Sequence, residues 1–301
     1  MNALVQAAVY RAAARVCPDR LRRAGYLARA HVLIMAAENG PHCNQYEHDP
    51  DCQYYAPSQG KGKTGNSNQI INATKDEIKQ ANDRAVSDGI SNGVEVYGPC
   101  SKNELDEITD AVVEIRNKYP QVQIDSIIVE TGETTRRSFP DDTPEDADNI
   151  AAWVSYDNPT VLHVNGDNQT QGIHSRDGWT KSGKAPNGDY YNSWMTGDGS
   201  INDLIIHETG HSLHFLHSGK NVILSDDKGN NYKISVDRYL LNIYINDMNS
   251  TTAKERPASL SGYSCCDECE YFAEMFTQYV KDKSKLSAKR REVVEKVLSA
   301  K

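Results

Sequence analysis

The sequence lacks long apolar runs, internal repeats and an excess of positive charge. No stretch approaches 18 consecutive apolar residues, which excludes a membrane-spanning helix. The 33 basic and 42 acidic side chains give a net charge of −9, which argues against a general binder of nucleic acids or anionic membranes. With 301 residues, the chain is long enough for one large or two small domains with a sizeable core.

Acidic residues and lysine are scarce at the N-terminus. Residues 1–30 contain six arginines and a single acid, Asp19, and the first lysine is Lys61. We therefore expect residues 1–40 to be an Ala/Arg-rich extension or a targeting-like segment outside the folded domain. Their compact apolar run at residues 31–37 is too short and lies too late to be a convincing secretory signal.

A linker and one domain follow the extension. Residues 41–70 are rich in Gly, Ser, Pro and Asn and have no apolar periodicity, which predicts a flexible linker. This linker contains Cys43 and Cys52, a candidate disulfide pair. Residues 71–301 are expected to form the folded domain.

Cysteines and glycosylation sequons favour a secreted glycoprotein. Of the seven cysteines, six remain once Cys17 of the extension is set aside, enough for three disulfide bonds. Asn-x-Thr triplets begin at Asn72, Asn168 and Asn249. Together these features predict an oxidising, extracellular setting, with the free thiols of a cytosolic protein as the alternative.

Capping signals and apolar periodicity predict a chain of mixed α/β (α+β) class. Thr74 with Glu77, and Ser101 with Glu104, have the spacing of capping boxes. The predicted helices cover residues 74–87, 101–118, 147–154, 200–215, 236–246, 268–281 and 287–298. The predicted strands are 122–129 and 160–164, with a hairpin at 221–235 and a long loop at 165–199. Strand 160–164 is a candidate edge strand that could pair with an extended peptide, with His163 as a packing residue.

One sequence motif indicates a metal-binding site. His207-Glu208-Thr209-Gly210-His211 lies within a predicted helix, where residues four apart share a face, so both imidazoles can reach one metal ion. A zinc ion suits two histidines and a third ligand, with an open position for water. Glu208 is placed to accept a proton from that water. The alternative is a surface helix with incidental histidines.

Two choices of third ligand follow from the residues. His217 stands six residues after His211, as in the extended metzincin motif, but His214 occupies the position where that motif has a turn-forming glycine. Glu270 and Glu274 lie further on, in the predicted helix with sequence ECEYFAEMF. We expect Glu270 rather than His217 to be the ligand.

The pairing of HETGH with the downstream E-Y-F-A-E helix, and with Tyr263 seven residues before Glu270, resembles the catalytic domain of anthrax toxin lethal factor and its relatives. These are gluzincin zinc metallopeptidases, and the specific similarity covers about residues 200–280. The resemblance implies a zincin-like fold with a small mixed sheet and an active-site helix. It also implies site roles, namely His207, His211 and Glu270 as zinc ligands, Glu208 as general base, Tyr263 as oxyanion donor and Glu274 orienting a ligand histidine.

The predicted function is therefore that of a zinc-dependent metalloendopeptidase with one Zn²⁺ ion and a peptide or protein substrate. One alternative is a catalytically silent zincin-fold binding or toxin module. Another is a metzincin-like peptidase with His217 as third ligand. Cys265, Cys266 and Cys269 depart from the family pattern and are expected to staple the loop of Tyr263 or to displace that residue.

Overall fold

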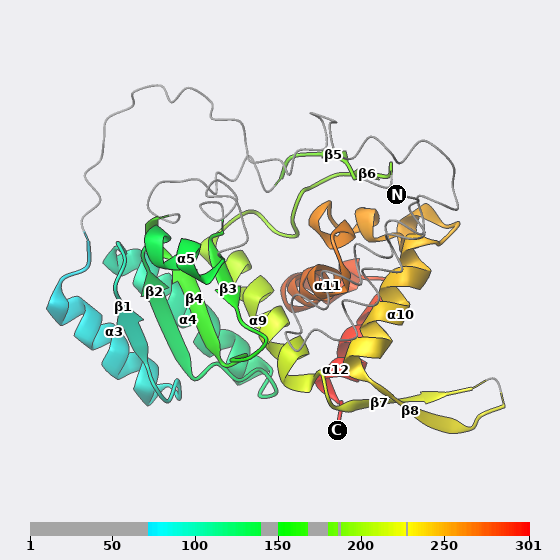
Figure 1. The fold of residues 1–301 in the computed structure, drawn as a ribbon, viewed down its shortest axis with the longest axis horizontal. Coiled ribbons are helices and arrows are strands. Elements are labelled where there is room, and N and C mark those ends of the chain that lie inside the picture. The colour runs from blue at the N-terminus through cyan, green and yellow to red at the C-terminus, as the bar shows by residue number, and fades with distance from the viewer. Residues whose placement is uncertain (1–71, 140–149, 168–179, 186–187, 227) are drawn as a thin grey trace, which may run out of the picture. The chain divides into compact units, whose positions relative to one another are not determined.

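The structure is a computed structural model that describes residues 72–139, 150–167, 180–185, 188–226 and 228–301. All of these described residues belong to one compact unit (Figure 1). The proposed extension at 1–40 and the linker at 41–70, including Cys43 and Cys52, lie outside the described residues, as does the sequon at Asn168. Within the described part of the chain, no helix is long and apolar enough to cross a membrane.

Seven α-helices of the described residues share N-termini capped by a side chain. They are α3 (Lys75–Ser87), α4 (Lys102–Lys118), α5 (Gly132–Ser138), α9 (Ile201–His217), α10 (Val236–Met248), α11 (Glu268–Asp282) and α12 (Ala288–Leu298). Both predicted capping boxes are present, at Thr74 with Glu77 and at Ser101 with Glu104. Short 3-10 helices lie at Ala253–Glu255, Pro257–Ser259, Tyr263–Cys265 (η4) and Lys283–Lys285.

The strands form one mixed sheet and two small hairpins. The sheet contains β1 (Val94–Val96), β2 (Ser126–Glu130), β3 (Ala152–Val154) and β4 (Val161–Asn165) in the order β1-β2-β4-β3. β1, β2 and β4 are parallel, whereas β3 runs antiparallel to β4. The hairpins are β5 (Gly183–Lys184) with β6 (Tyr190–Tyr191), and β7 (Asn221–Ser225) with β8 (Asn231–Ser235).

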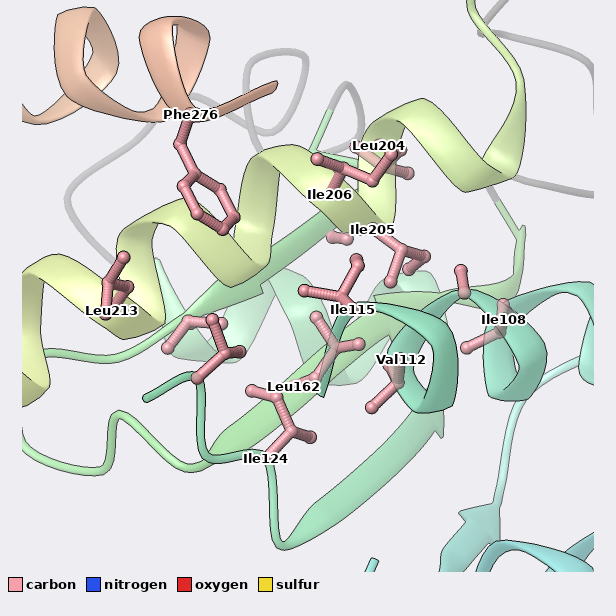
Figure 2. Packing of buried hydrophobic residues seen from close by; sticks show 14 of the residues in the cluster. Ile108, Val112, Ile115, Ile124, Leu162, Leu204, Ile205, Ile206, Leu213 and Phe276 are labelled. Carbon is pink, nitrogen blue, oxygen red and sulfur yellow. The ribbon is translucent and has the colours of Figure 1, made fainter. Parts of the chain in front are cut away.

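The core lies between one face of the sheet and helices α4 and α9. In β4, Leu162 and Val164 are buried on this face, because alternate residues of a strand point the same way. Figure 2 shows Leu162 beside the buried Val112 and Ile115 of α4. Ile205 of α9 packs into the same cluster. This packing fixes α9, which carries the HETGH motif, against the sheet.

Three predictions about the sheet need correction. Ala152–Val154 form a strand rather than the end of a helix, because pairing with β4 decides their conformation. The predicted strand 122–129 begins only at Ser126, since Val122 and Ile124 are buried in the core without strand pairing. Strand 160–164, observed as β4, is internal, and the edge strand beside it is β3. The mixed α/β class and the small mixed sheet are confirmed.

Candidate metal centre

Helix α9 presents the two motif histidines on one face. It begins after Ser200, whose hydroxyl accepts a hydrogen bond from the backbone N–H of Asp203 at 3.2 Å, as the sequence predicts. His207 and His211 are one turn apart and both are buried. The helix therefore delivers two imidazoles to the same place with little conformational freedom.

Helix α11 lies across α9 and carries the acidic partners. Asp267 caps α11 by accepting hydrogen bonds from the backbone N–H groups of Cys269 and Glu270, at 2.8 and 2.9 Å. The two helices approach closely at Gly210, where an added Cβ would lie 3.0 Å from the Cα of Ala273. The missing side chain at Gly210 thus allows α11 to bring its glutamates up to the histidines.

Three side-chain atoms form a nearly equilateral triangle. The Nε2 atoms of His207 and His211 lie 3.0 and 3.2 Å from Oε2 of Glu270 and 3.1 Å from each other. In a tetrahedral zinc site with bonds of about 2.0–2.1 Å, ligand atoms lie about 3.3 Å apart. Among the described residues, this is the one group of histidine, cysteine and carboxylate side chains that is spaced to hold a metal ion.

Glu274 contacts the ring nitrogen of His207 that faces away from the triangle. Its Oε1 lies 2.9 Å from Nδ1 of His207, and its Oε2 accepts a hydrogen bond of 2.6 Å from the backbone N–H of Thr196. A proton on Nδ1 satisfies the Glu274 contact and leaves the lone pair of Nε2 directed at the Glu270 carboxylate. Two acceptors at 3.0 Å repel each other unless a proton or a cation lies between them, so this donor set fits a metal ion.

The charged groups of the site shift one another's pKa values. Burial lowers the pKa of His207, but contacts with Glu270 and Glu274 outweigh burial and raise it well above its usual value. Burial raises the pKa of Glu270, but the charge of His211 and the contact with His207 outweigh it and hold that pKa low. Glu270 is therefore a carboxylate, as a metal ligand must be.

Glu208 lies next to the triangle as a buried carboxyl group. Burial raises its pKa to about 7, although the nearby charges of His211 and His207 act in the opposite direction. A carboxyl group that titrates near neutral pH can both accept and return a proton. Glu208 thus has the chemistry that a general base requires.

Tyr263 lies beside His207, with 5.7 Å between the ring centroids. It belongs to η4, and its backbone N–H donates a 2.7 Å hydrogen bond to the carbonyl of Trp194. The negative charge of Glu270, followed by burial, raises the pKa of its phenol well above the usual value. The hydroxyl therefore stays protonated and remains a hydrogen-bond donor. The cysteines that follow do not displace Tyr263 from the site.

The four described cysteines carry free thiols. They are Cys100, Cys265, Cys266 and Cys269, and no disulfide joins any two of them. The predicted stapling of the Tyr263 loop by disulfide bonds is not found within the described residues. Burial raises the pKa values of Cys100 and Cys265 to about 12, so both stay as neutral thiols.

The other motif-proximal histidines point elsewhere. Nδ1 of His217 lies 2.8 Å from the carbonyl oxygen of Val297 in α12, which makes it part of a helix–helix contact. Nε2 of His214 lies 3.1 Å from Oδ1 of Asp237 in α10. The structure therefore brings Glu270, and not His217, to the two motif histidines. His214 and His217 both lie in the last turn of α9.

His163 has the predicted packing role in the sheet. Its ring stacks on Trp153 of β3 with 3.8 Å between centroids, and its Nδ1 lies 3.3 Å from Oε2 of the buried Glu130. This cluster joins β2, β3 and β4 on the sheet face opposite the core.

Sequence reasoning missed three contributors to the site. Thr196 supplies the N–H that holds Glu274, and the ring of Trp194 is tilted against that of Tyr263, with 5.6 Å between centroids. Both residues lie in the predicted loop at 165–199, which has no apolar periodicity, so no local sequence pattern identifies them. The third is Phe215, whose ring lies 5.8 Å from that of His211. Its spacing of four residues from His211 could have placed it on the metal-facing side of α9.

Comparisons of the chain with known protein families, with curated proteins and with solved structures find no match. The geometry of the site is therefore the basis for any functional conclusion.

Proposed function

We propose that this protein is a zinc-dependent metalloendopeptidase of the gluzincin type, similar to the catalytic domain of anthrax lethal factor. The observation that carries the proposal is the triangle of His207, His211 and Glu270, with atoms 3.0–3.2 Å apart and Glu208 beside it. This donor set, two imidazole nitrogens and one carboxylate oxygen, is that of a catalytic zinc site with an open fourth position.

Zinc held by these three residues would supply Lewis-acid chemistry and lower the pKa of a water at the open position to about 7. The protein's own residues transfer the proton and stabilise the developing charge. Glu208 accepts the proton of the attacking water and then donates it to the leaving amine. Glu208 is buried and lies one residue from the ligand His207, which places it close to that water.

Tyr263 and Glu274 have supporting roles in this mechanism. The phenol of Tyr263 donates a hydrogen bond to the carbonyl oxygen of the substrate as negative charge develops there. Its raised pKa keeps the donated proton in place. Glu274 fixes the ring of His207 through Nδ1 and so directs Nε2 into the centre of the site.

We further propose that the domain has a zincin-like fold and that a peptide substrate pairs with β3. This strand is the antiparallel edge of the sheet, and it packs against α9, which carries the histidines. An edge strand has unpaired backbone groups that an extended peptide can satisfy. The substrate is thus a stretch of unfolded or extended polypeptide.

Two other functions are less well supported. A silent binding module needs no general base, yet Glu208, Tyr263 and the three ligands are all present and close together. A metzincin-like site needs His217 as third ligand, but this side chain contacts Val297 instead.

Secretion remains part of the proposal, on the basis of the sequons. Asn72 and Asn249 are exposed, as acceptors of glycans must be. Intact-mass analysis of protein secreted from eukaryotic cells, before and after glycosidase treatment, tests this point. An unchanged mass would leave the cytosolic alternative.

Cleavage of an unfolded protein by the full chain and by Glu208→Gln, at equal zinc content, tests the function. The wild-type chain should cleave, a chelator should stop cleavage, and Glu208→Gln should retain zinc without cleaving. Cleavage by both proteins would contradict the mechanism. Zinc binding without cleavage by either would favour the binding module.

A further inference from the structure

A second candidate site lies between the β7–β8 hairpin and α10, and no residue of the metal centre lines it. It is a groove of about 550 Å³, which falls within the range of ligand-binding clefts. Because it shares no side chain with the triangle of metal-binding residues, its occupant can be considered independently of peptide hydrolysis.

The hairpin supplies an apolar side of the groove. Leu224 of β7 pairs with Tyr232 of β8, so these two residues project from the same face of the hairpin, together with Ile234. Leu224 and Ile234 are half-buried, and the side chain of Tyr232 is 48% exposed. This face therefore retains apolar surface that the described residues do not cover.

Helix α10 supplies a polar side. Arg238, Asn242 and Asn246 line the groove at intervals of four residues, so they form one stripe along the helix. All three are exposed. An asparagine amide offers both a donor and an acceptor, which matches the N–H and C=O groups of an extended peptide backbone.

The charge of the groove is positive, in contrast to the chain as a whole. Lys233 and Arg238 line it, and neither forms an ion pair with a described residue. None of the described residues that line the groove has a carboxylate, whereas the chain has a net charge of −9.

Three carboxylates around this groove have partners of their own. Asp237 contacts His214, while Asp247 and Glu292, which lie close enough to Tyr239 to affect its titration, pair with Lys289 and Lys296. Arg238 forms no ion pair with a described residue, so it is available to a ligand of opposite charge.

We propose that this groove binds an extended acidic peptide segment in which apolar side chains alternate with carboxylates. The apolar side chains of the segment pack on Leu224, Tyr232 and Ile234, and a carboxylate of the segment pairs with Arg238 of α10. The Asn242 and Asn246 amides hydrogen-bond with its backbone. Such a groove would recruit acidic substrates or partner proteins at a distance from the bond that is cleaved.

The test uses a fluorescein-labelled ten-residue peptide in which glutamate alternates with leucine and tyrosine, and a counterpart with lysine in place of glutamate. Anisotropy measures their binding to the full chain carrying Glu208→Gln, which prevents cleavage of the probe. The acidic peptide should bind, and its affinity should fall as salt is raised. The lysine peptide should bind at least about tenfold more weakly.

Peptide affinities of substituted proteins test whether the peptide binds in this groove. Arg238→Glu should weaken binding of the acidic peptide by about tenfold or more. Glutamate is well tolerated there, because Arg238 is the third residue of a helix capped by Ser235. Lys228→Glu makes the same charge change at the hairpin turn, outside the groove, and should leave affinity within about twofold. Asn242→Ala with Asn246→Ala should weaken binding without any change of charge.

Three results would overturn the proposal. They are equal binding of the two peptides, absence of binding by the acidic peptide, and an equal loss of affinity in Lys228→Glu and Arg238→Glu. A fourth such result would come from the oligomeric state, which sedimentation measures. If the chain forms a dimer that Tyr232→Ala dissociates, the groove is an interface between two copies of the chain.

Discussion

Nδ1 of His207 lies 2.9 Å from Oε1 of Glu274, a residue that is completely buried and also held by the backbone of Thr196. A buried carboxylate that contacts only one nitrogen of a histidine leaves the other nitrogen with a fixed direction. His211 has no such support, since its Nδ1 has no hydrogen-bond partner among the described residues. A second carboxylate therefore orients His207 but not His211.

Glu274→Gln should weaken zinc binding by about 10–100-fold, because the amide no longer holds the Nδ1 proton of His207 as strongly. The affinity is measured by competition with a chelator of known affinity. Glu292→Gln on the exposed side of α12 is the control and should leave zinc affinity unchanged. Equal affinities of the wild type and Glu274→Gln would show that Glu274 does not orient the ligand.

Glu270→Ala and His217→Ala distinguish the two possible third ligands. Glu270→Ala should abolish tight zinc binding, because it removes one corner of the triangle. His217→Ala should keep zinc but lower the free energy of unfolding, because it removes a buried contact between α9 and the Val297 carbonyl of α12. Zinc content after dialysis and denaturant unfolding measure the two effects. Loss of zinc in His217→Ala with retention in Glu270→Ala would instead support a metzincin-like site.

Tyr263→Phe should keep both the fold and the zinc content. Its kcat should fall by about 10²–10³-fold with little change in KM, because the phenol acts on the charge that develops in the transition state. Steady-state kinetics on a peptide substrate measure the effect. Tyr190→Phe is the matched control, since that side chain is 80% exposed. If kcat is unchanged in Tyr263→Phe, the hydroxyl has no part in the reaction.

Gly210→Ala should destabilise the domain by about 1–3 kcal/mol, because the new Cβ would lie 3.0 Å from the Cα of Ala273 and push α9 and α11 apart. It should also weaken zinc binding, since Glu270 and the histidines are on opposite helices. Gly219→Ala is the control, because no atom lies within 4 Å of an added Cβ there. Urea unfolding and chelator competition measure both properties. A variant as stable as the wild type would mean that the helices move apart without cost.

Local sequence signals predicted most helices correctly. The capping boxes at Thr74 and Ser101 and the cap at Ser200 are short-range hydrogen bonds between residues three apart, so their spacing is visible in the sequence. The hairpin at 221–235 follows from its turn residues in the same way. Ala152–Val154 was predicted wrongly because their conformation depends on pairing with β4, about ten residues away along the chain.

The sequence by itself determined that His207 and His211 share one face of α9, because a helix places residues four apart on the same face. Only the tertiary structure decided that Glu270 completes the triangle, that Glu274 and Thr196 brace it, and that His217 turns away to α12. These contacts join residues about sixty to eighty positions apart, and those of Glu270 depend on how closely α9 and α11 approach at Gly210. Helical periodicity carries no information about that approach, because packing between separate elements sets it.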